Sequence, residues 1–97
     1  MTSVARVGDA GLVHCSSFVI ATGSPNVFVN ARPVARVGDS SSTHLMPVGK
    51  KCIPHVAPII AGAATVFVNG RPVARVGSPL AMCTVIVQGS PNVFVGL

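Results

Sequence analysis

The chain has 97 residues and a net charge of +5, 49% of its residues are hydrophobic, and it contains 10 Gly and 8 Pro but no Trp or Tyr. This length allows one domain with a thin core that a metal ion or a partner would stabilise, and the composition favours short strands and turns over helices. No apolar run approaches the roughly 20 residues needed to cross a bilayer and the N-terminus lacks the pattern of a signal peptide, so we expect a chain made in the cytoplasm.

Two short phrases alternate along the chain. Residues 4–8 read VARVG, and the same letters return at residues 34–38 and 73–77. The phrase VFV occupies residues 27–29, 66–68 and 93–95, and Gly and Pro precede two of its copies. Short runs rich in Val and bounded by turn residues are typical of strands. The central Phe28, Phe67 and Phe94 are then equivalent, and we expect them in the core.

Turn signals join each VFV strand to the VARV strand after it. Asn69-Gly70 is the strongest short signal for a two-residue hairpin turn. Asn30-Ala31 occupies the same place in the first copy, and because Ala is poorer than Gly at positive φ, we expect a different or longer turn there. The last VFV strand and the first VARV strand lack neighbours along the chain. We predict that they pair and close a ring of three hairpins, with the chain ends side by side.

Three residues of metal-binding types share one register of the repeat. His14, His44 and Cys83 each lie nine positions after the Ala of a VARVG phrase. They occupy the connections that leave the VARVG strands and return along VFV, so connectivity gathers them opposite the hairpin turns. A structural zinc takes four N or S ligands in a tetrahedron, and His55, on the longest connection, is the remaining His. We therefore predict one structural Zn²⁺ per chain, bound by these four residues.

The remaining cysteines and the two aspartates are more simply explained by structural roles. An odd number of Cys without a CxxC pair is poor evidence for a disulfide framework, so we expect Cys15 and Cys52 to be buried or partly exposed, although either could supply the sulfur ligand instead. Asp9 and Asp39 follow the repeated Gly, where a carboxylate either accepts a hydrogen bond from a ligand imidazole or caps a turn. Ser78 stands in their place in the third copy, which favours the cap.

The sequence gives little support to catalysis or to nucleic-acid binding. The two Asp are the only carboxylate side chains and a zinc with four protein ligands has no open position, so we expect no enzyme, with a Cys-His hydrolase as a weak alternative. A small basic nucleic-acid-binding protein is the main alternative function. The five Arg recur at repeat positions, however, and no aromatic residues alternate with basic ones. Only Lys50 and Lys51 form an independent basic spot.

Residues 32–39 (RPVARVGD) and 71–77 (RPVARVG) resemble the Pro-Ala-Ala-Arg signature of the PAAR-repeat family. Val34 and Val73 replace its first Ala, residues 3–6 lack its Pro, and the resemblance runs from about residue 4 to residue 95. It implies an all-β cone of short strands with pseudo-threefold symmetry, which caps the spike of a type VI secretion system or a contractile phage tail. A zinc at the pointed end would be bound by His and Cys side chains, which map here onto the four ligands already named.

The resemblance also implies a docking face. The broad end of the cone would sit on a trimeric VgrG-type or phage-baseplate β-helical spike, one chain per trimer. On this chain that end would present Asn30, Ala31, Arg32, Asn69, Gly70, Arg71 and Leu97. Because the repeats fill residues 1–97, we expect a single domain without extensions. It would sharpen the spike for piercing a target membrane, be ejected with it, and offer an attachment point for toxin effectors.

Overall fold

The computed structural model describes residues 2–13 and 15–96, and the chain is all-β over those ranges. No helix among them is long and apolar enough to cross a membrane. The strands form four antiparallel pairs: β1 (Thr2–Ser3) with β8 (Phe94–Val95), β2 (Phe28–Val29) with β3 (Arg32–Pro33), β4 (His44–Val48) with β5 (Lys51–His55), and β6 (Phe67–Val68) with β7 (Arg71–Pro72). The predicted fold class of short β-hairpins is confirmed.

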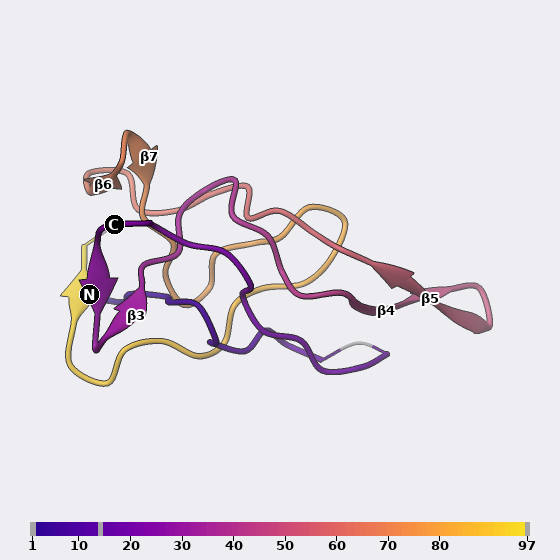
Figure 1. Ribbon diagram of the computed structural model, residues 1–97. Helices are drawn as coiled ribbons and strands as arrows, with labels where there is room; N and C mark the ends of the chain where they lie inside the picture. Colours follow the sequence, from indigo (N-terminus) through magenta and orange to yellow (C-terminus); the bar gives the residue numbers. More distant parts are fainter. Residues whose placement is uncertain (1, 14, 97) are drawn as a thin grey trace.

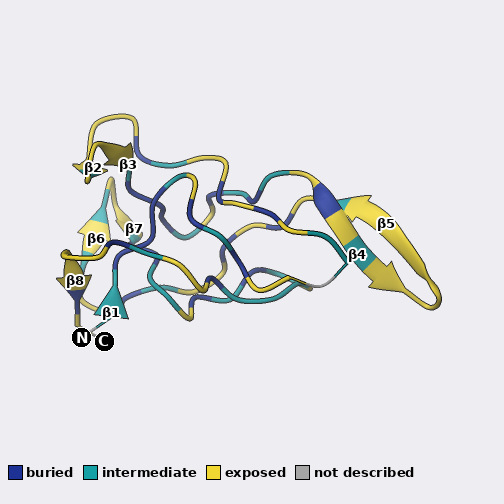
Figure 2. Ribbon diagram, turned by 90° about the horizontal axis from the view of Figure 1, so that it is seen from below, coloured by how far each residue is buried: buried dark blue, intermediate teal, exposed yellow. Residues whose placement is uncertain are grey.

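The molecule is elongated, with extents of 39 × 24 × 23 Å. The pairs β1–β8, β2–β3 and β6–β7 gather at one end, which we call the three-hairpin end, whereas β4–β5 projects from the opposite end (Figure 1). Thr2 is opposite Val95 and Ser3 opposite Phe94, so the first and last strands pair as predicted. Most of the projecting β4–β5 hairpin is exposed (Figure 2).

The three VARVG segments are joined by a cycle of backbone hydrogen bonds. Ala5 N–H donates to the Ala74 carbonyl at 3.0 Å, Ala74 N–H to the Ala35 carbonyl at 2.9 Å, and Ala35 N–H to the Ala5 carbonyl at 3.0 Å. All three alanines are fully buried. Because the side chain of alanine is only a methyl group, the three backbones can approach one another closely at the centre.

The core consists of two clusters of buried side chains. The larger contains the three central alanines and three fully buried isoleucines, and its members are Ala5, Phe18, Ile20, Ala35, Ala57, Ile59, Ala74, Leu80 and Ile86. The smaller is made of Val4, Val34, Ala63, Val73 and Val95. Burying one Ile side chain contributes about 1.5–3 kcal/mol, so the equivalent Ile20, Ile59 and Ile86 are a large part of what stabilises a chain this small.

The expectation that the three Phe side chains are buried was wrong. Phe28, Phe67 and Phe94 are 55%, 57% and 46% exposed. Successive side chains of a strand point to opposite faces, and in each VFV strand the Val after the Phe packs against the smaller core cluster or belongs to it. The Phe therefore faces outward, and the three-hairpin end carries three exposed aromatic rings.

The expectation of a different turn at Asn30-Ala31 was also wrong. Val29 is opposite Arg32, just as Val68 is opposite Arg71, so both turns have two residues. Asn30 and Ala31 have φ values of 55° and 63°, beside 55° and 77° for Asn69 and Gly70. Positive φ at both positions is the type I′ pattern. The Asn30 side chain secures the turn, because its Oδ1 accepts hydrogen bonds from the Arg6 guanidinium and the Ser90 hydroxyl.

Asp9 and Asp39 cap turns, as the simpler interpretation predicted. Asp39 Oδ2 accepts from the Arg36 backbone N–H at 2.8 Å and from its Nε at 2.9 Å, while Oδ1 accepts from Nη2 at 3.1 Å. Asp9 makes the same three bonds to Arg6. Each repeat with an Asp therefore holds a buried arginine in a two-pronged ion pair within its own turn.

Candidate metal centre

The β4–β5 hairpin brings two of the predicted ligands together. Its strands are joined by a turn at Gly49, whose φ is 60°, and its register places His44 directly opposite His55. The two side chains therefore leave the hairpin as a cross-strand pair at the end nearest the core. This hairpin was not predicted, and Gly49 between two five-residue strands was the sequence signal for it.

The donor atoms of His44, His55 and Cys83 converge. His55 Nε2 lies 2.7 Å from His44 Nε2, and Cys83 Sγ lies 3.3 Å from His44 Nε2 and 3.5 Å from His55 Nε2. All three ligand atoms are within 4.8 Å of one another, so the group could hold a metal ion. His44 is buried, whereas His55 and Cys83 are half-buried.

The His44 ring is fixed in a ligand-ready orientation. Its Nδ1 lies 2.8 Å from the Ser42 carbonyl oxygen, to which only a protonated Nδ1 can donate, and this leaves the Nε2 lone pair facing His55 and Cys83. The Phe18 ring stacks on the imidazole with 4.1 Å between centroids and 19° between planes. A hydrogen bond from one ring nitrogen thus aims the other at the site.

Cys83 is supplied by a tight loop. Leu80 N–H donates to the Thr84 carbonyl at 2.8 Å and Cys83 N–H to the Leu80 carbonyl at 3.2 Å, while Met82 between them has a φ of 49°. Burial raises the pKa of the Cys83 thiol, and a hydrogen bond from the Thr84 backbone acts in the opposite direction. A bound cation would supply the positive charge that a buried thiolate requires.

The donor set fits zinc. With Zn–N near 2.0–2.1 Å and Zn–S near 2.3 Å, a tetrahedral site places its nitrogens ~3.3 Å apart and nitrogen and sulfur ~3.5 Å apart. The two N···S distances match those values, and the 2.7 Å N···N distance requires the imidazoles to separate slightly. Two imidazoles and a thiolate are also borderline-soft donors of the kind that zinc prefers.

His14, the fourth predicted ligand, lies outside the described residues. Residues on either side of His14 are hydrogen-bonded to segments that lie near Cys83 and His44. Leu12 N–H donates to the Val85 carbonyl at 2.9 Å, just past the Cys83 loop, and Ser16 Oγ accepts from the Leu45 N–H at 2.9 Å in β4. Both flanks of this connection thus contact the elements that carry the described donors.

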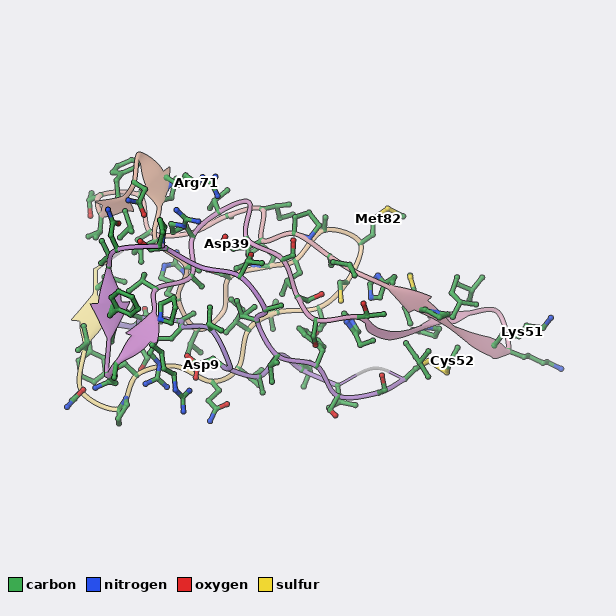
Figure 3. All side chains as sticks on the ribbon, viewed as in Figure 1. Asp9, Asp39, Lys51, Cys52, Arg71 and Met82 are labelled. Atoms are coloured by element: carbon green, nitrogen blue, oxygen red, sulfur yellow. A yellow bond between two sulfur atoms is a disulfide. The ribbon has the colours of Figure 1, made fainter. Side chains whose placement is uncertain are left out.

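The expectation against a disulfide was wrong. Cys15 and Cys52 form one across a sequence separation of 37 residues, with their Cα atoms 5.9 Å apart, and Cys52 lies on the projecting hairpin (Figure 3). Counting cysteines could not reveal the pair, because only the folding of two connections to one end brings them together. Neither sulfur is then free to ligate, which leaves Cys83 as the sulfur donor of the group.

The predicted docking residues lie at the three-hairpin end. The turn residues Asn30 and Asn69, the residues that follow each of them, and Arg32 and Arg71 are all exposed there. Leu97 lies outside the described residues. The candidate metal centre, at the base of the projecting hairpin, is therefore separated from the predicted docking face along the long axis.

A family profile matches most of the chain. No curated protein sequence matches the chain. The profile of the PAAR motif matches residues 2–43 and 50–97, and the unmatched residues 44–49 contain β4 and the start of its turn. The match includes two of the three VARVG phrases with their Pro and the first without it, and all three VFV strands. The chain therefore belongs to the PAAR motif family.

Proposed function

We propose that this protein is the structural tip of the spike in a contractile injection system, docked by its three-hairpin end and holding a zinc ion at the other. The PAAR motif family is associated with spike-tip proteins of such systems, and its members are structural rather than enzymatic. On this proposal the protein leaves the cytoplasm with the spike and contacts the target membrane transiently.

The observation that carries the proposal is the exposure of three equivalent Phe side chains at one end. Phe28, Phe67 and Phe94 come from three hairpins built from the same phrase, and each is about half exposed. Exposed aromatic side chains in a patch mark interaction surfaces. A trimer presents three copies of one surface at its end, and three equivalent rings on a single chain can each meet one copy.

Zinc would stabilise the opposite end, with His14 completing the set of His44, His55 and Cys83. The ion supplies Lewis-acid attraction for four donors, and the chain's residues do the rest: the Ser42 carbonyl holds the His44 ring, and the β4–β5 register holds His55 beside it. Structural zinc contributes roughly 10 kcal/mol in small metal-dependent domains. Such a gain would suit a small tip under mechanical load.

Two of the five arginines give the nucleic-acid alternative no support. Arg6 and Arg36 are buried and paired with Asp9 and Asp39, so their charge is neutralised within the chain. Among the described residues, the lysines at the tip of β4–β5 remain the basic spot that the sequence indicated. Binding to DNA or RNA that weakens steeply with salt would favour this alternative.

The test is binding to the cognate spike trimer, measured by light scattering with the Phe67→Asp variant and the matched Ile60→Asp variant. Ile60 is 55% exposed and is not part of a hairpin at the docking end. We expect one chain per trimer, loss of binding for Phe67→Asp and normal binding for Ile60→Asp. Equal binding by both variants, or three chains per trimer, would contradict the proposal.

A further inference from the structure

The third copy of the repeat lacks the partners that satisfy its arginine in the other two. Arg6 donates from Nε and Nη2 to Asp9 and from Nη1 to Asn30, at 2.8–2.9 Å. Arg36 donates in the same way to Asp39 and, at 3.0 Å, to Asn69. Each of these guanidinium groups therefore donates to one carboxylate and one side-chain amide of the same chain.

Arg75 occupies the same position with neither partner. Ser78 replaces the Asp, and its Oγ accepts only from the Arg75 backbone N–H, at 3.0 Å. Gly96 replaces the Asn, because it follows Val95 as Asn30 follows Val29 and has no side chain to offer. Among the described residues, Arg75 Nε is the one buried side-chain polar atom without a hydrogen-bond partner. A buried charged donor left unsatisfied is costly, which points to a group supplied from outside.

Space for that group is present. In the first copy Arg32 Nη1 covers the turn: it lies 3.3 Å from Asp9 Oδ1, and a methyl group added to Gly8 would stand 3.6 Å from it. Thr2 replaces Arg32 in the third copy, and a methyl group added to the equivalent Gly77 would meet no atom of residues 2–13 or 15–96 within 4 Å. The third turn is thus open beside Gly77, the side that Arg32 closes in the first copy; Arg75 as a whole is half-buried, and its Nε is shielded from solvent.

We propose that Arg75 binds a carboxylate of the docking partner, from an Asp or Glu side chain or a chain terminus. Arg75 adjoins the docking end, because it forms a β-bridge with Val4, which directly follows β1. The partner's identity rests on the proposed function, whereas the carboxylate chemistry rests on Arg75 alone. Since Arg6 and Arg36 are paired with Asp9 and Asp39, only one subunit of a trimer meets an arginine that has no carboxylate partner within the chain. The contact therefore makes one of the three otherwise identical spike subunits differ from the other two.

The first experiment uses the protein by itself, as purified. Acetate replaces chloride at constant ionic strength while the arginine Nε–H signals are followed by ¹⁵N NMR, with Arg75→Lys used for assignment. We expect a saturable shift for Arg75 and none for Arg6 or Arg36. Equal shifts of all five arginines, or no shift of Arg75, would overturn the site whatever the spike binds.

The second experiment gives Arg75 an internal partner by Ser78→Asp or, separately, Gly96→Asn. A restored charge-assisted bond is expected to raise the Tm by about 5 °C or more, and to weaken binding to the spike trimer at least tenfold. Ser17→Asp is the control for the added charge of Ser78→Asp, because Ser17 is exposed and adjoins Phe18, which stacks on His44 at the metal centre. If neither variant changes the Tm or the affinity more than this control does, the proposal is wrong. If acetate shifts Arg75 but the spike does not bind at all, the proposed function fails and the anion site stands.

Discussion

Replacing Asp39 by Ser would convert the second turn into a copy of the third. Asp39 is 4% exposed and accepts from the backbone, Nε and Nη2 of Arg36 and from the Thr22 hydroxyl. A Ser at this position keeps the backbone bond, as Ser78 does with Arg75. The remaining three bonds are lost and the Arg36 guanidinium stays buried.

Removing one partner of a buried ion pair costs about 3–5 kcal/mol. The Asn69 side chain still accepts from Arg36 Nη1 and the Gly23 carbonyl from Nη2, so we expect the low end, about 3 kcal/mol. At about 4–8 °C per kcal/mol for a domain of this size, the Tm should fall by about 12–24 °C. Urea unfolding of both proteins at pH 7 measures the free-energy difference directly.

The difference should also depend on pH. Burial acts to raise the pKa of Asp39, but the hydrogen bonds from Arg36 and Thr22 and the Arg36 charge outweigh it and hold the pKa below its usual value. A lowered folded-state pKa contributes stability above the unfolded value near 4, and that stability is lost as the pH falls through the folded pKa. The stability difference between the two proteins should therefore shrink as the pH falls below about 4 and through the lowered folded-state pKa. A difference under 1 kcal/mol at pH 7, or one that is unchanged in acid, would refute the reasoning.

Three further changes test the rest of the structure. Cys83→Ser should reduce bound metal from near one equivalent to a small fraction, by elemental analysis, because sulfur is lost from the donor group; a variant that keeps a full equivalent would exclude this site. Cys52→Ser should cost about 4 kcal/mol in urea unfolding by the loop-closure relation for a separation of 37 residues, and a change under 1 kcal/mol would show that the loop is ordered without the bond. Ala35→Val should lower stability by about 1–3 kcal/mol, because its added methyls must enter the close approach of three backbones; a thermal melt as high as that of the natural protein would mean that the centre has room.

The sequence was sufficient to predict the ring and the convergence of the described ligands. Three copies of VARVG and VFV constrain one another, since any pairing of one copy must suit the others, and the unmatched first and last strands could pair only with each other. Because His44 and Cys83 share one position in the repeat, both were expected at the same end of the molecule. These predictions depend on the equivalence of the three copies, which can be read directly from the repeated residues.

Two of the features that were missed, the β4–β5 hairpin and the disulfide, break the equivalence of the copies. Pro47 and Pro54 lie in β4 and β5, and because Pro lacks a backbone donor, such segments do not resemble strands. The Cys15–Cys52 bond joins two connections of unequal length, so no repeat register relates its ends. The burial of each Phe was predicted wrongly for a different reason. Alternation places Val and Phe on opposite faces of a strand, but in a three-residue strand it does not say which face meets the core.

The cycle of hydrogen bonds among Ala5, Ala35 and Ala74 also limits how such a protein can grow. In a linear repeat array each unit contacts only its neighbours, and units can be added at the ends. Here each alanine amide donates to the next segment and the last returns to the first, so a fourth copy has no place to enter. Added residues must go into the connections instead. The β4–β5 hairpin is such an addition: it lies on the longest connection and projects away from the closed ring.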